Sequence, residues 1–203
     1  AAVAGGVTSV MDMPNTDPQT TTMAEIDKKI AIAESKSLVN FSCYLGATNE
    51  NIDEVVNVDK NKVCGIKVFL GASTGNMRVN DPKVLERIFA ESPILVATHN
   101  EDEEIISANL KKVKEELGDQ PMAIDLATRY GTRLHVLHLT TAKELALFSN
   151  KPATEKKITA ETCVGYLWFD DNDYERLNAK IKCNPAIKKE KSRINLLKAI
   201  EMG

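Results

Sequence analysis

Residues 61–76 read NKVCGIKVFLGASTGN. If residues 63–70 form a β-strand, alternate side chains point to opposite faces of the sheet. One face is then wholly apolar, and the other is apolar except for Lys67. Strands that are apolar on both faces are typical of parallel sheets covered by helices. This stretch therefore predicts an α/β protein with a lysine in the interior of its sheet, or at a strand end from which its amine reaches water.

Similar apolar runs recur along the chain and alternate with helical patterns, and repeated β-then-α units predict a parallel sheet with helices outside it. We expect strands at Val7–Met13, Val39–Leu45, Val63–Leu70, Ile94–Thr98, Arg133–Leu139 and Ile158–Val164. We expect helices at Met23–Ser37, Pro82–Ala90, Glu101–Leu117, Met122–Tyr130, Thr141–Ser149 and Lys191–Met202, with Gly131 ending the fourth of these.

An open doubly wound sheet and a (β/α)₈ barrel both fit this order. The phosphate-binding patterns GxGxxG and GxxxxGK[ST] are absent, which disfavours a nucleotide-binding open sheet. A complete barrel has eight strands and about 250 residues. We therefore expect one domain over residues 1–203 that holds about six of the eight β/α units, in a chain that begins within the fold.

The composition excludes several classes of function. The net charge of −3 gives no electrostatic argument for binding nucleic acid or an anionic membrane, and no apolar run approaches the roughly 20 residues of a membrane span. The first residues, AAVAGGVTSV, lack the basic start of a signal peptide. The four cysteines form no CxxC pair, so we expect reduced, buried thiols and a cytoplasmic location.

The three histidines of the chain, His99, His135 and His138, lie at or near the ends of predicted strands, where α/β folds place their sites. His135 and His138 are three residues apart, so on a strand they face opposite sides. We expect His138 to point inward and His135 to face the helix layer. Taken singly, His138 is more simply a core histidine, and His99 a polar residue at a helix entry. Two inward histidines beside a strand that carries Lys67 favour a shared site.

Zinc is the metal ion for which these side chains are suitable ligands. Neutral imidazoles bind zinc well, but an ammonium group cannot. Burial lowers the pKa of a lysine and supplies a neutral amine, which can add carbon dioxide and become an anionic carbamate. The hypothesis is therefore a cation held by Lys67, His99 and His138, with Lys67 carboxylated.

The sequence resembles the dihydroorotases of the cyclic amidohydrolase group, within the amidohydrolase superfamily. The resemblance rests on five stretches, GGVTSVMDMPNTDP (5–18), GIKVFLGASTGNM (65–77), VATHNEDE (96–103), GTRLHVLHLTTAKEL (131–145) and IKCNPAIK (181–188). It implies a (β/α)₈ barrel with two zinc ions bridged by a carboxylated lysine. That enzyme closes N-carbamoyl-L-aspartate to dihydroorotate, or opens the ring, in pyrimidine biosynthesis.

By the same resemblance, Lys67 is the catalytic, bridging lysine, and His99 and His138 complete the second metal. Asn15 and Asn184 match substrate-binding positions, and a homodimer is a further expectation. The family's HxH pair and its last-strand aspartate have no counterpart here, and Gly165-Tyr166 stands where the family has histidines. We therefore expect the 203 residues alone to be inactive. Two alternatives stay open: another cyclic amidohydrolase (hydantoinase or allantoinase), or an inactive dihydroorotase-like scaffold subunit.

Overall fold

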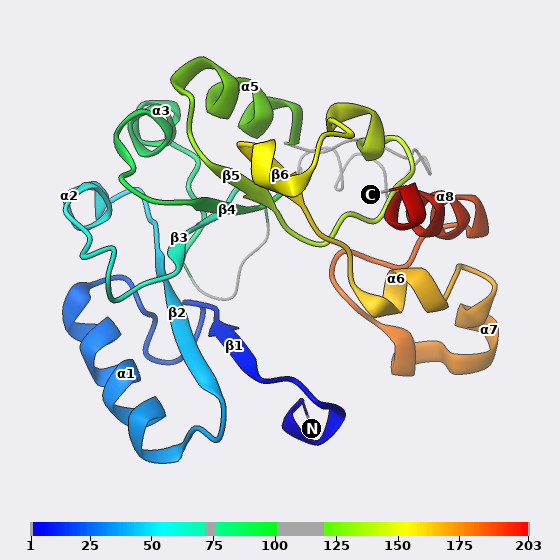
Figure 1. Ribbon diagram of the computed structural model, residues 1–203, viewed down its shortest axis with the longest axis horizontal. Helices are drawn as coiled ribbons and strands as arrows, with labels where there is room; N and C mark the ends of the chain where they lie inside the picture. Colours follow the sequence, from blue (N-terminus) through cyan, green and yellow to red (C-terminus); the bar gives the residue numbers. More distant parts are fainter. Residues whose placement is uncertain (1, 72–75, 101–119, 203) are drawn as a thin grey trace.

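The computed structural model describes residues 2–71, 76–100 and 120–202 of the chain. Six strands form one parallel sheet in chain order, curved as a half-barrel (Figure 1). The α/β prediction is confirmed, and each predicted strand overlaps an observed one, although β2 and β4 each end one residue beyond the predicted range. The strands are β1 (Ser9–Asp12), β2 (Asn40–Gly46), β3 (Gly65–Phe69), β4 (Val96–His99), β5 (Leu134–Val136) and β6 (Ile158–Ala160).

The helices α1 (Met23–Lys36), α2 (Ile52–Val56), α3 (Pro82–Glu91) and α5 (Gln120–Tyr130) lie between successive strands. After β6 the chain forms α6 (Val164–Trp168), α7 (Asp173–Leu177) and α8 (Glu190–Met202). Short 3₁₀ turns are η1 (Val3–Gly5), η2 (Glu144–Leu147), η3 (Ala153–Glu155) and η4 (Asn178–Ile181). The helix predicted at Glu101–Leu117 lies outside the described residues.

Local sequence explains where these helices begin and end. The Thr22 side chain accepts a hydrogen bond from the amide of Glu25 and caps α1, and Asp81 caps α3 with Pro82 in its first turn. Gly131 follows α5 with φ 67°, a left-handed conformation that glycine adopts without strain, as predicted.

The helix predicted at Thr141–Ser149 is wrong. The Glu144 carboxylate accepts hydrogen bonds from the amides of Thr140 and Thr141, which closes only the single turn η2. Pro152 disfavours a helical conformation in the residue before it, so the turn does not continue as a helix.

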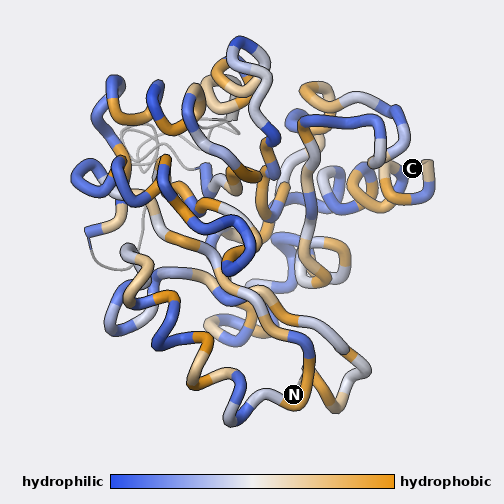
Figure 2. The backbone as a smooth tube through the Cα atoms, turned by 60° about the vertical axis from the view of Figure 1, so that its left-hand side comes forward, coloured by the Kyte–Doolittle hydropathy of each residue, from blue (hydrophilic) through white to orange (hydrophobic). Residues whose placement is uncertain are grey.

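The two faces of the sheet have different surroundings. The outer face carries Ile66, Val68, Val96, Leu134 and Val136, which join the main hydrophobic core together with side chains of α1, α3 and α5. Figure 2 shows hydrophobic residues running through the strands and alternating with hydrophilic ones along the helices. The inner face is the opposite one, and it carries the polar side chains of the candidate site.

Two other sequence expectations can be compared with the structure. Cys43 is buried, but Cys163 and Cys183 are exposed, so the expectation of buried thiols is wrong for these two because the chain leaves the sheet before each of them. Within the described ranges, no helix is long and apolar enough to cross a membrane.

Candidate metal centre

Lys67 lies at the middle of β3, in a strand whose five residues are all buried. Only 2% of the surface of Lys67 is exposed to solvent, so its amine does not reach water from the end of the strand. The amine donates a hydrogen bond to the carbonyl of Val68 at 3.2 Å and lies 3.9 Å from the centre of the Phe69 ring. No carboxylate of the described residues pairs with it, and burial lowers the pKa of Lys67 well below its ordinary value. The site therefore favours the neutral amine.

The strand register places His99 on the same face as Lys67. Lys67 pairs with Ala97, and Phe69 pairs with His99. Paired residues of neighbouring strands point to the same side of a sheet, and so do residues two apart on one strand. The imidazole of His99, at the carboxyl end of β4 and 7% exposed, therefore projects from the inner face, beside the Phe69 ring at 5.9 Å between ring centres.

His138 reaches the same place by a bend after β5. The strand ends at Val136, and His138 has φ 44°, which is uncommon for a residue other than glycine. On one side of the bend, the Leu137 amide donates to the carbonyl of Thr98 at 3.1 Å. On the other, the Leu139 amide donates to the carbonyl of Glu161 at 2.7 Å. The bend brings His138 Nε2 to 2.8 Å from His99 Nδ1.

The expectation that His135 faces the helix layer is wrong. His135 pairs with Ala97, which pairs with Lys67, so all three lie on the inner face. The alternation argument assumed a strand that continues through His138, whereas the strand ends two residues earlier. Both histidines therefore lie on the inner side, His135 by strand alternation and His138 by the bend.

The paired histidines fit a zinc ion with a small adjustment. Tetrahedral zinc with nitrogen ligands at about 2.05 Å needs about 3.3 Å between the two nitrogens. The observed 2.8 Å between His99 Nδ1 and His138 Nε2 is shorter, as a direct hydrogen bond requires, and a slight ring rotation opens it. Among the residues described, no group of three or more His, Cys, Asp or Glu side chains could hold a metal. A carboxylated Lys67 is a further ligand of the right charge on the same face.

The predicted substrate-binding asparagines occupy two loops. Asn15 is half-buried in the loop after β1, which is closed by a hydrogen bond from the Thr20 amide to the Pro14 carbonyl at 2.9 Å. Asn184 is exposed and precedes Pro185, whose carbonyl accepts a hydrogen bond from the Tyr166 hydroxyl at 2.7 Å. Their contact with a substrate stays a prediction.

Comparison with known proteins agrees with this geometry. The half-barrel matches L-hydantoinase (dihydropyrimidinase) from Arthrobacter aurescens with a TM-score of 0.87 and 26% identity, over 100% of this chain and 49% of that one. The fold is therefore part of an amidohydrolase barrel. No family model matches the chain.

Curated relatives are named for two activities. The allantoinase of Deinococcus radiodurans is 29% identical over 210 residues, which cover 93% of this chain and 47% of the relative. The dihydroorotase of Methanothermobacter thermautotrophicus is 29% identical over 212 residues, which cover 96% of this chain and 47% of the relative. The chain spans about half the length of the curated relatives it matches. The chain is thus similar to enzymes named allantoinase and to enzymes named dihydroorotase, and the names of the relatives divide between these two activities.

Proposed function

We propose that this chain carries one metal-binding half of the active site of a zinc-dependent dihydroorotase. The reaction is the reversible cyclisation of N-carbamoyl-L-aspartate to (S)-dihydroorotate. The observation that carries the proposal is the contact between His99 and His138 on the face of the sheet that also holds the buried Lys67. The carboxylated form of a buried amine and two imidazoles form a donor set suited to zinc. They lie on the wall of a barrel of the amidohydrolase type.

Lys67 contributes a nucleophilic amine before it contributes a ligand. Because burial favours the unprotonated form, the nitrogen can bond to the carbon of carbon dioxide and release a proton. The resulting carbamate carries one negative charge on two oxygens. His99 Nδ1 and His138 Nε2 face each other at 2.8 Å, and an imidazole binds zinc through an unprotonated ring nitrogen. When bound, zinc supplies Lewis-acid activation of water and of the ring carbonyl.

The choice of dihydroorotase among the cyclic amidohydrolases rests on the stretches MPNT (13–16) and NPAIK (184–188), with Asn15 and Asn184 proposed to bind the substrate. The relatives named allantoinase and hydantoinase keep a second candidate open, a cyclic amidohydrolase acting on hydantoin or allantoin. The affinities of the zinc-loaded protein for dihydroorotate, hydantoin and allantoin separate the two, because binding can be measured on a chain that lacks part of the catalytic site.

Zinc content per chain tests the metal site. After dialysis against zinc and bicarbonate, the wild-type protein should retain zinc, and Lys67→Ala and His99→Ala should lose it. Lys60→Ala is the matched control, because Lys60 is exposed. Bicarbonate-free buffer should lower the zinc content of the wild type alone. A wild type that holds no zinc would support the inactive scaffold instead, and equal zinc in wild type and Lys67→Ala would exclude a carbamate ligand.

A further inference from the structure

A second polar cluster occupies the inner face beside the histidine pair. It joins His135 of β5 to Thr159 and Glu161 at the end of β6. His135 Nδ1 lies 2.8 Å from Thr159 Oγ1, and His135 Nε2 lies 3.3 Å from Glu161 Oε2. A hydroxyl can donate to Nδ1 while Nε2–H donates to a carboxylate, so a neutral imidazole satisfies both contacts. Nothing in the proposed metal site uses this cluster.

Glu161 is tied to the bend that carries His138. Its amide donates to the carbonyl of Val136 at 3.0 Å, and its carbonyl accepts from the amide of Leu139 at 2.7 Å. These two bonds enclose the residues that turn His138 toward His99. The Glu161 side chain therefore starts at the same end of the sheet as the histidine pair.

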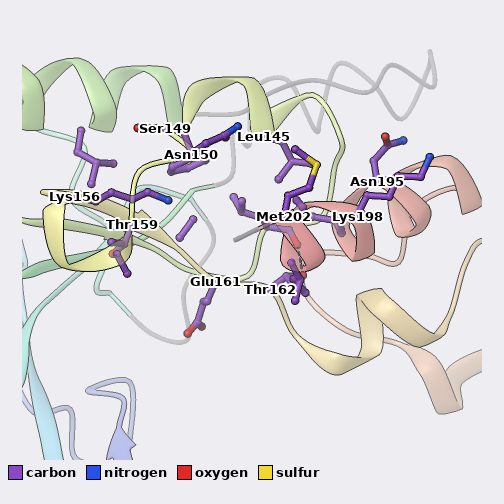
Figure 3. Close-up of a pocket in the computed structure, with 18 residues that line it drawn as sticks. Leu145, Ser149, Asn150, Lys156, Thr159, Glu161, Thr162, Asn195, Lys198 and Met202 are labelled. Atoms are coloured by element: carbon purple, nitrogen blue, oxygen red, sulfur yellow. Dashed lines mark hydrogen bonds between the residues drawn. The ribbon is translucent and has the colours of Figure 1, made fainter.

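The Glu161 carboxylate lies on the inner face of the half-barrel, two residues after Thr159, which pairs with His135. The hydrogen bond from His135 lowers the pKa of Glu161, which favours the ionised carboxylate. Across the sheet, burial raises the pKa of Tyr44 on β2 to about 12, and the charge of Glu161 is among the lesser causes. Figure 3 shows the carboxylate pointing away from Leu145 and Met202, which line the pocket between β6 and α8. An anionic acceptor thus lies within electrostatic reach of both sides of the inner face.

The position of the Glu161 carboxylate suits a contact with one end of a small cyclic substrate. The Glu161 side chain is 49% exposed, so a ligand can reach it, while the His135 side chain is 22% exposed and holds one of its oxygens. The other oxygen, Oε1, makes no hydrogen bond to the described residues. A carboxylate accepts hydrogen bonds and donates none. Cyclic amides and ureides carry ring N–H donors next to the carbonyl that reacts.

We propose that Glu161 is a substrate-binding residue that accepts a hydrogen bond from a ring N–H of the cyclic amide, and that His135 is the residue that positions it. The inference rests on the proposed function, because it takes the reacting carbonyl to face the His99–His138 pair. It adds a contact on the opposite side of the ring. Since His135, which contacts Thr159, already holds one oxygen of the carboxylate, binding orders little that was mobile before.

The experiment uses zinc-loaded protein and three probes, hydantoin and its two mono-N-methyl derivatives, with affinities measured by calorimetry. Loss of a hydrogen bond to a charged group weakens binding about 10-fold or more. The substitution Glu161→Gln should weaken the affinity for hydantoin about 10-fold. The N-methyl derivative that lacks the donating N–H should bind the wild type as weakly as hydantoin binds the Glu161→Gln variant. Its affinity should not change when Glu161 is replaced by glutamine. Equal effects of the substitution on all three probes, or no effect, would overturn the assignment.

Substitutions of His135 separate positioning from simple structural support. Glutamine can place an amide N–H near the position of Nε2, whereas asparagine reaches only the position of Nδ1. His135→Gln should therefore keep hydantoin affinity near the wild-type value, and His135→Asn should reproduce the loss seen in Glu161→Gln. Similar losses in both His135 variants would overturn the positioning role.

Zinc content distinguishes this inference from the proposed function. Glu161→Gln should retain zinc, because Glu161 is not among the proposed ligands. Wild-type protein that binds zinc and hydantoin without the N-methyl pattern would refute the Glu161 contact alone. Wild-type protein that holds zinc but binds no hydantoin would also refute this contact alone, whereas wild-type protein that holds no zinc would refute the proposed function and this contact with it.

Discussion

Replacing Lys67 by methionine should stabilise the metal-free protein and abolish its zinc binding. Methionine has nearly the length of lysine and no charge, so it fills the same space on β3. Lys67 is 2% exposed and has no ion-pair partner among the described residues, and burial lowers its pKa. Burying a polar group without its full set of hydrogen bonds costs about 1–3 kcal/mol, and an apolar group of similar volume avoids that cost. We expect about 2 kcal/mol, which raises the melting temperature of a chain of this size by about 4–8 °C.

The sign of the pH dependence follows from the direction of the pKa shift. The folded-state pKa of Lys67 lies below its ordinary value of 10.5, so between the two pKa values the unfolded chain binds more protons than the folded one. Stability of the wild type therefore rises as the pH rises toward the unfolded pKa, and falls as the pH drops. Lys67→Met lacks this dependence. The stability advantage of the variant should be larger at pH 7 than at pH 10.

Urea unfolding in the presence of a chelator, at both pH values, measures these differences. The control is Lys60→Met, in which an exposed lysine is changed and neither stability nor zinc binding should move by much. Two results would refute the reasoning. Destabilisation by Lys67→Met in the chelator would mean that the amine makes a net stabilising contact. Zinc retained by Lys67→Met would mean that residue 67 is not a ligand.

Three further substitutions test the fold by chemical denaturation. Gly65→Ala should cost about 2 kcal/mol, because the added Cβ would lie 2.8 Å from the backbone oxygen of Leu95, and an unchanged midpoint would contradict this close packing. Tyr166→Phe should cost about 1 kcal/mol by removing the hydrogen bond to the Pro185 carbonyl, and a more stable variant would mean that this bond contributes nothing. Thr22→Ala should cost about 1 kcal/mol through the lost cap of α1, whereas Thr22→Ser should not.

The sheet could be predicted from sequence because the signal is local. Runs of apolar residues punctuated by polar ones locate a strand to within a few residues, and all six observed strands overlap the predicted ranges. Most predicted strands are longer than the observed ones, and the excess is largest at β5 and β6. At β5 the pattern continues through Leu139 but the pairing stops at Val136, because His138 adopts a positive φ. A sequence pattern shows which residues suit a strand, and it does not show where the backbone turns away.

The candidate site was predictable to the extent that it depends on one strand. Lys67 interrupts an apolar face, and this indicated either a buried amine or an amine that reaches water from the strand end. The meeting of His99 with His138, and of His135 with Glu161, depends on how β4, β5 and β6 are aligned. Register between strands is set by packing and is not contained in the alternation within any one of them. For that reason the inner-face position of His135 was missed.

The row of residues that includes Lys67 explains how a modified lysine could be accommodated. Across the sheet this row runs from Gly46 through Lys67, Ala97 and His135 to Thr159. Lys67 thus has glycine on one side and alanine on the other. The tip of Met77 lies only 2.1 Å from the position where a Cβ on residue 46 would be, so a side chain from outside the row already fills the glycine side. On the other side, Ala97 lies on the same face of β4 as His99, two residues before it, so we expect a carbamate that passes over the small Ala97 side chain to extend toward His99 and His138.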